Sequence, residues 1–148
     1  MVSLIIAWPF VNMYNIIEYI IFWGVTVLEF ITLDIDFSVC KIKDTHNIDF
    51  TRTFVFLSKT DEELSLVCES VYVPPDAIAV EDGWKAFRIA GILDFGLIGI
   101  IANITKILAE AEISVFVVST YNTDYIFLKS KDFDKGLALI KQKYKEAV

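Results

Sequence analysis

The sequence has few of the residue types from which catalytic and metal centres are built. Among its 148 residues there is one histidine, His46, and the two cysteines, Cys40 and Cys68, are far apart with no C-x-x-C spacing. Transition-metal sites need clusters of Cys, His and carboxylate ligands, so no metal site is predicted. Phosphate-binding-loop, nucleophile-elbow and H-E-x-x-H motifs are also missing from the sequence. We therefore expect a protein that is not an enzyme and has no cofactor.

Basic residues are in the minority. The chain has 13 Lys and Arg against 20 Asp and Glu, which gives a formal net charge of −7. A chain of this charge without a basic stripe repels nucleic-acid backbones, so DNA and RNA are not expected as partners. Cys40 and Cys68 lie in strand-like runs and are interpreted as small buried hydrophobic residues of a reducing compartment. The expected location is the cytoplasm.

The first 33 residues contain no Lys or Arg and only two acids, Glu18 and Glu29. They account for much of the positive mean hydropathy, +0.56. Residues 16–33 are nearly long enough to cross a bilayer, which takes about 20 apolar residues, but each acid costs about 3 kcal/mol near the bilayer centre. The segment lacks the basic start and the cleavage pattern of a signal peptide. Three interpretations remain open: a membrane anchor with the rest of the chain cytoplasmic, an extra helix on the domain or in a dimer, or an extension.

The rest of the chain is interpreted as two units. In the first unit, alternating apolar residues predict strands at 36–42, 51–57 and 64–68, without a good helix between them. Pro74 and Pro75 then break regular structure. The chain is thus divided into an apolar segment (1–33), a reduced first unit (34–73), a linker (74–83) and a second unit (84–148).

The second unit has a clearer pattern. It predicts a strand at 85–89, an amphipathic helix over 97–111, strands at 113–118 and 124–129, and a final helix capped by Asp132. This order predicts an α+β fold with the helices on one face of an antiparallel sheet. In each unit a turn rich in Ser, Thr and Asp joins two strands, which is a weak internal repeat.

Two stretches of the second unit predict a small-ligand pocket. Residues 91–99, Gly-Ile-Leu-Asp-Phe-Gly-Leu-Ile-Gly, lead from a predicted strand into the predicted helix. A turn of this kind leaves N–H groups free at the positive end of a helix, where a carboxylate or phosphate can bind. Residues 119–125, Ser-Thr-Tyr-Asn-Thr-Asp-Tyr, supply hydroxyls, an amide and a carboxylate between two strands. This set of groups favours ligand binding over catalysis.

The sequence resembles a known family at these places. Residues 99–102, Gly-Ile-Ile-Ala, with 107–111 and 113–115, resemble the helix and second strand of an ACT domain, a ferredoxin-like regulatory module that often binds amino acids. The words Leu-Asp-Phe at 93–95 and Ser-Thr-Tyr-Asn-Thr-Asp-Tyr at 119–125 resemble the CASTOR-type tandem ACT family in particular. The resemblance implies two βαββαβ units with antiparallel sheets, the first of them reduced. Exposed strand edges favour a homodimer.

The sequence also departs from that family. Asp94 is five residues before Gly99, whereas common ACT domains have this Asp three residues before the glycine; the longer spacing fits the CASTOR-like subgroup. Glu112 stands where the family usually has glycine, and a left-handed backbone there would cost about 1 kcal/mol. Too few residues follow Tyr144 for a closing strand, so the second sheet is expected to be short or completed elsewhere.

The resemblance implies a site for a free amino acid. N–H groups around Phe95 to Ile100 would bind its α-carboxylate, and Asp94 or Asp124 with carbonyl groups of the turn would bind its α-ammonium. Asp94 could instead cap the helix, and Asp124 could be a turn residue. The alternative function is an oligomerisation or interaction module without a ligand, attached to a membrane if residues 1–33 form an anchor. The candidate ligand-binding residues are Asp94, Phe95, Gly96, Leu97, Ile98, Gly99, Ile100, Ser119, Thr120, Tyr121, Asn122, Thr123 and Asp124.

Overall fold

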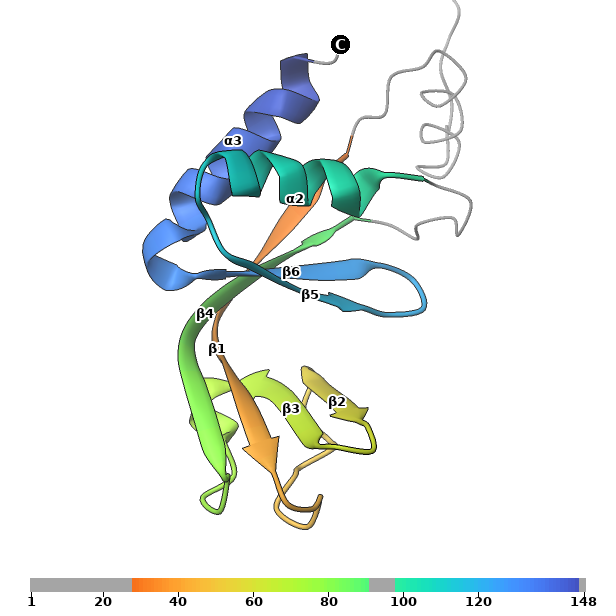
Figure 1. The fold of residues 1–148 in the computed structure, drawn as a ribbon, viewed down its shortest axis with the longest axis vertical. Coiled ribbons are helices and arrows are strands. Elements are labelled where there is room, and N and C mark those ends of the chain that lie inside the picture. Colours follow the sequence, from red (N-terminus) through yellow and green to blue (C-terminus); the bar gives the residue numbers. More distant parts are fainter. Residues whose placement is uncertain (1–27, 91–97, 147–148) are drawn as a thin grey trace, which may run out of the picture.

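The computed structural model describes residues 28–90 and 98–146, which form one antiparallel sheet with two α-helices (Figure 1). The α+β class with an antiparallel sheet is as the sequence predicted. The strands are β1 (Phe30–Ile42), β2 (Val55–Lys59), β3 (Leu64–Glu69), β4 (Ala79–Ile89), β5 (Val115–Ser119) and β6 (Asp124–Lys129). The helices are α2 (Ile100–Glu110) and α3 (Phe133–Glu146), and there are two short 3-10 turns, η1 (Ser70–Tyr72) and η2 (Ser130–Asp132).

The strand order in the sheet is β2-β3-β1-β4-β6-β5, with the two long strands β1 and β4 at its centre. The second part of β1, from Phe37 to Ile42, pairs with β3. Its first part, from Phe30 to Leu33, pairs only with the end of β4, whose other edge pairs with β6. The start of β1 therefore lies along the edge of β4 opposite β6, where a closing strand after α3 was expected to be missing.

Two of the predicted domain boundaries fall within these long strands. The predicted division between residues 33 and 34 falls inside β1, and residues 79–83 of the predicted linker belong to β4. Phe30 is 9% exposed, and its ring packs edge to face on Phe87. Residues 28–33 are therefore part of the folded domain; the rest of the apolar first segment lies outside the described residues.

Irregularities in the pairing of β1 with β4 bend the sheet. The register shifts between Leu33 and Asp36, and again between Phe37 and Val39. At the second shift β4 holds an extra residue, and Gly83 there has a φ of 79°, which glycine adopts without strain. The fully buried Ser38 hydroxyl donates to the Asp82 carboxylate (2.5 Å) across this shift and bonds the Ser70 hydroxyl (2.8 Å). The bend turns the β2–β3 end toward the β5–β6 end (Figure 1).

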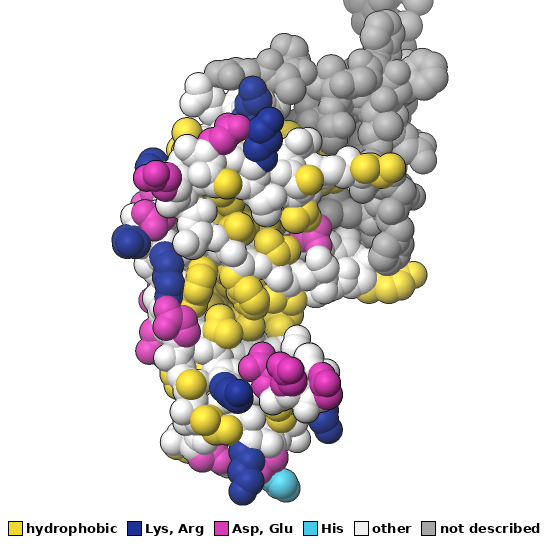
Figure 2. Space-filling view, viewed as in Figure 1, with side chains coloured by type: hydrophobic (Ala, Val, Ile, Leu, Met, Phe, Trp, Pro, Cys, Tyr) yellow, Lys and Arg dark blue, Asp and Glu magenta, His cyan; other side chains and the backbone are white. Residues whose placement is uncertain are grey.

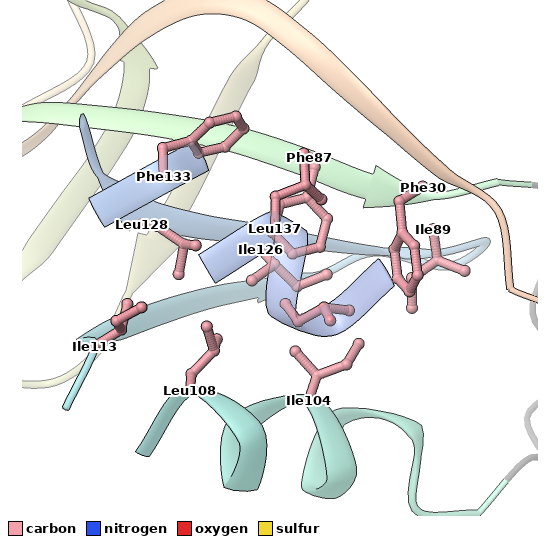
Figure 3. Close-up of a cluster of buried hydrophobic side chains, with 11 residues drawn as sticks. Phe30, Phe87, Ile89, Ile104, Leu108, Ile113, Ile126, Leu128, Phe133 and Leu137 are labelled. Atoms are coloured by element: carbon pink, nitrogen blue, oxygen red, sulfur yellow. The ribbon is translucent and has the colours of Figure 1, made fainter. Parts of the chain in front are cut away.

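Both helices cover one face of the sheet at its β4–β6–β5 end (Figures 1 and 3). The amphipathic pattern of the sequence is confirmed, because α2 buries Ile104 and Leu108 against this face. A β-carbon at Gly136 of α3 would lie 2.6 Å from a Leu128 methyl group, so this helix approaches the sheet closely. The buried residues of this core are Phe30, Phe87, Ile89, Ile104, Leu108, Ile113, Ile126, Leu128, Phe133, Leu137 and Ile140.

The other side of this part of the sheet carries an aromatic cluster between the two bent ends. Phe37 packs on Phe127 with ring centroids 5.3 Å apart, and Phe56 packs on Tyr125 at 5.0 Å. Figure 2 shows hydrophobic side chains gathered in the hollow between the two ends. We call β1 to η1 the first half of the chain and β4 to α3 the second half. A third cluster, which includes both cysteines, lies under the connections of the first half. Both cysteines are free and buried, and burial raises the pKa of the Cys68 thiol to about 12.

The weak repeat of the sequence has a regular counterpart in the structure. β5, β6 and η2 begin sixty residues after β2, β3 and η1 respectively. The turns between the strands also agree: Thr60 N–H donates to the Glu63 carbonyl and Thr120 N–H to the Thr123 carbonyl, both at 2.9 Å. The difference lies in the connections, because α2 and α3 have no helical counterpart of similar length in the first half that the structure describes.

Candidate ligand-binding site

The helix end predicted to bind an anion begins at Gly99. This residue is the N-cap of α2 and has a left-handed backbone, with φ 85° and ψ 3°. A β-carbon here would meet no described atom within 4 Å, and the left-handed conformation by itself favours glycine. No side chain of the described residues caps the helix, and the first N–H groups of α2 are donors of the kind that binds an anion.

Only part of the predicted glycine-rich stretch can be placed. Gly99 and Ile100 form the start of α2, and Ile98 is almost fully exposed just before them. Asp94, Phe95, Gly96 and Leu97 lie outside the described residues. The choice between a capping and a ligand-binding role for Asp94 therefore stays a prediction.

The turn between β5 and β6 is held by two threonines. The Thr120 hydroxyl donates to the Thr123 carbonyl (2.7 Å), which closes the turn. The Thr123 side chain is 7% exposed, and its hydroxyl donates to the carbonyl oxygen of Ile89 at the end of β4 (2.8 Å). Thr123 thereby fixes the turn to the end of β4, a positioning role that the sequence did not predict.

The other turn residues differ in exposure. Ser119 and Asn122 are exposed, and Tyr121 is 81% exposed. Asp124 is half-buried at the start of β6, opposite Ser119. The turn and the first residues of α2 lie on the same side of the molecule, beyond the end of β4 (Figure 1). The described parts of the two predicted motifs are therefore neighbours of the same strand end.

Arg88 is a residue of this end that the sequence analysis missed. Its side chain is half-buried, and one guanidinium nitrogen donates to the Ile89 carbonyl at 3.5 Å, a weak bond. Thr123 donates to the same oxygen. No carboxylate of the described residues lies within ion-pair distance of Arg88. The only signal in the sequence was a basic residue just before the glycine-rich stretch.

The described residues contain no group of three or more potential metal ligands. His46 is exposed, and its ring bonds the Asp44 carboxylate at 2.8 Å. Hydrogen bonds from the backbone and ring of His46 lower the pKa of Asp44. This pair belongs to a surface turn.

A hollow of about 540 Å³ lies at the equivalent end of the first half. It is bordered by the β2–β3 turn and by the end of β1. Lys41 and Glu63 both line it and form an ion pair at 3.7 Å. The first half thus has an open hollow where the second half has its candidate site, and the hollow contains the Lys41–Glu63 ion pair.

The fold is of the α+β class, with a curled antiparallel sheet that matches the ferredoxin-like arrangement of ACT domains. Residues 79–142 match the ACT domain family. This stretch contains β4, α2, β5, β6, most of α3 and the candidate site. A search of curated proteins gave no match.

Solved structures resemble most of the chain. A protein from Agrobacterium tumefaciens is 28% identical, with a TM-score of 0.67 over 78% of this chain and 87% of that one. The aspartate kinase of Clostridium acetobutylicum, described as an allosteric enzyme, is 14% identical, with a TM-score of 0.58 over 80% of this chain and 34% of the kinase. The regulatory subunit of aspartate kinase from Thermus thermophilus is 9% identical, with a TM-score of 0.54 over 79% and 98% of the two chains. At these identities the two kinase proteins establish the fold alone.

Neither helix in the described part of the chain has the length and apolar character needed to cross a membrane. Most of the segment considered as an anchor, residues 1–27, lies outside that part.

Proposed function

We propose that this chain is a regulatory module that binds a free amino acid at the β4 end of its second half. The observation that carries the proposal is the position of the helix start at Gly99, which no described side chain caps, on the same side as a polar turn that Thr123 fixes to the end of β4. The helix start supplies N–H donors for an α-carboxylate, and Asp124 supplies a half-buried carboxylate for an α-ammonium. The module acts by binding and not by catalysis.

We further propose that the chain is a tandem ACT protein of the CASTOR type, whose two units share their long strands. One unit would be β2-β3-β1 with the start of β4, and the other would be β5-β6-β4 with the start of β1. The spacing of sixty residues between equivalent elements and the matching turns support this division. The first unit, without long helices, would serve mainly to cover the aromatic face of the second.

The regulated output is proposed to be association of two copies. β5 is an edge strand of the described sheet, and its residues Val115 to Val118 are apolar and half-buried. Such an edge pairs readily with another strand. A ligand that binds next to the β5–β6 turn would bias this association by its different affinity for the two states. The same edge also favours the second candidate function, an interaction module without a ligand.

The test is a thermal-shift screen of the full chain against the twenty amino acids, followed by calorimetric titration with any that stabilise it. A ligand at 100 times its dissociation constant raises the free energy of unfolding by about 2.7 kcal/mol, which is easily detected. Asp124→Ala is expected to weaken binding, and Ser58→Ala, at an exposed position of the first half, is the matched control. Absence of stabilisation by all twenty would reject the amino-acid site and leave the interaction module, which sedimentation would then examine.

A further inference from the structure

The two halves of the chain offer an internal comparison at the ends of their long strands. Lys41 of β1 pairs in register with Ser65 of β3, and Arg88 of β4 pairs with Tyr125 of β6. Ser65 and Tyr125 are sixty residues apart, the spacing that relates all the equivalent elements. Lys41 and Arg88 are therefore equivalent basic residues beside equivalent turns.

The two basic residues have different surroundings. In the first half Lys41 forms an ion pair with Glu63, the last residue of the turn before β3. The residue equivalent to Glu63 in the second half is Thr123. A threonine hydroxyl carries no charge, and this one is already bonded to the Ile89 carbonyl. The second half has thus kept the cation at the strand end without the acid that pairs with it in the first half.

Arg88 is the less solvated of the two cations. Lys41 is exposed, whereas Arg88 is half-buried, and its one hydrogen bond to the described residues is the 3.5 Å contact with the Ile89 carbonyl. A guanidinium has five N–H donors, and the contact with Ile89 uses one of them among the residues that the structure describes, which exclude 91–97. Partial burial of a cation is unfavourable until an acceptor meets it, and a carboxylate, which can accept two parallel hydrogen bonds from a guanidinium, suits it best.

We propose that Arg88 is the carboxylate-binding residue of the second half, and that a bound ligand supplies the carboxylate that Glu63 supplies to Lys41 in the first half. The inference rests on the proposed amino-acid site and adds a side-chain cation at the end of β4. It selects ligands that have at least one free carboxylate. The Arg88 guanidinium, beside the Ile89 carbonyl, must be able to reach that carboxylate. That carboxylate is either the α-carboxylate or one on the side chain of the ligand.

The experiment compares two equivalent substitutions in the full chain. The ligand is the amino acid that most stabilises the wild-type chain, and its affinity is measured by calorimetric titration. Arg88→Gln is expected to weaken binding about 10- to 100-fold, the usual loss when a charge-assisted hydrogen bond is removed. Lys41→Gln is the matched control and is expected to leave the affinity within about twofold. Circular dichroism and a melting curve confirm that each variant is folded.

Amide derivatives of the ligand provide a second readout that a structural role of Arg88 would not change. The α-carboxamide of the ligand should bind the wild-type chain weakly, and Arg88→Gln should abolish the preference for the acid over the amide. If the α-carboxamide binds normally and a side-chain amide does not, Arg88 binds the side-chain carboxylate. The comparison of acid and amide on the wild-type chain does not depend on the folding of Arg88→Gln. If that variant does not fold, Arg88→Lys replaces it and should also reduce the preference for the acid.

The outcomes separate this inference from the proposed function. Equal affinity of Arg88→Gln and wild type, or no preference for acid over amide in the wild-type chain, overturns the role of Arg88 and leaves the amino-acid site intact. If no amino acid binds the wild-type chain, the proposed function fails and the inference fails with it. An equal loss of affinity in Lys41→Gln overturns the inference too, since the effect would then belong to the net charge of the chain.

Discussion

The ring of Phe30 meets the ring of Phe87 edge to face, with the centroids 5.7 Å apart. A second edge contact joins Phe30 to Tyr144 of α3 at 5.6 Å. Phe30 therefore links the start of β1 to the centre of the sheet and to the last helix. A residue of the apolar segment that the sequence analysis set apart from both units belongs to the main hydrophobic core.

Phe30→Ala is expected to lower the free energy of unfolding by about 3 to 5 kcal/mol, because it removes a buried ring and leaves a cavity. Urea denaturation of the full chain measures this change. Ile31→Ala is the control, since Ile31 is 36% exposed and outside the helix-side core. A chain that begins at residue 28 should keep a cooperative transition, and one that begins at residue 34 should lose most of its stability. Equal stability of these two chains would contradict the role given to Phe30.

Glu112→Gly is expected to stabilise the protein by about 1 kcal/mol. Glu112 follows α2 with a φ of 59°, as the family comparison of the sequence predicted. The N–H of Ile113 donates to the Leu108 carbonyl and that of Glu112 to the Ala109 carbonyl, so the backbone must keep this conformation. Glycine removes the steric cost of the β-carbon, which should raise the melting temperature by a few degrees.

The control for this position is Glu112→Ala, which removes the carboxylate but retains the β-carbon. Its stability should stay near that of the wild-type chain. If alanine stabilises as much as glycine, the effect belongs to the charge of Glu112 and not to its backbone conformation.

The sequence predicted the second half better than the first. The α2 pattern and the β5–β6 turn were found because apolar spacing and turn residues are local signals. The start of β1 was missed because Asp34 and Asp36 interrupt the apolar alternation at a register shift. The start of β4 was missed because Gly83 lies at the second register shift. The closing strand of the second half comes from a distant part of the chain, which no local pattern reports. Arg88 was missed because a basic residue on a strand has no distinctive signal until the structure shows that no described acid lies beside it.

Thr123→Val is expected to lower the free energy of unfolding by about 1 to 2 kcal/mol, because it leaves the buried Ile89 carbonyl with only a weak bond from Arg88. It should also weaken ligand binding, since the β5–β6 turn loses its attachment to β4. Thr105→Val is the control. The Thr105 hydroxyl bonds the Ile101 carbonyl inside α2 (2.9 Å), and that carbonyl keeps its helical partner when the hydroxyl is removed. Equal losses in the two variants would argue against a special role for the Ile89 bond.

The burial of Cys68 predicts how the stability of the protein depends on pH. Burial, and then the neighbouring Cys40, raise the pKa of the Cys68 thiol from 9.0 to about 12. The unfolded chain therefore loses this proton at a lower pH than the folded chain does, and stability should fall as the pH rises from about 9 toward 12. In the Cys68→Ala variant this part of the fall should be absent, although the variant is less stable at every pH because of the cavity. Urea denaturation at pH 8, 9 and 10 measures the difference, and parallel curves for wild type and variant would contradict the assignment.

A thiol reagent at pH 8 gives an independent check: both thiols should react slowly in the folded chain and rapidly after unfolding in urea, because the thiolate is the reactive form.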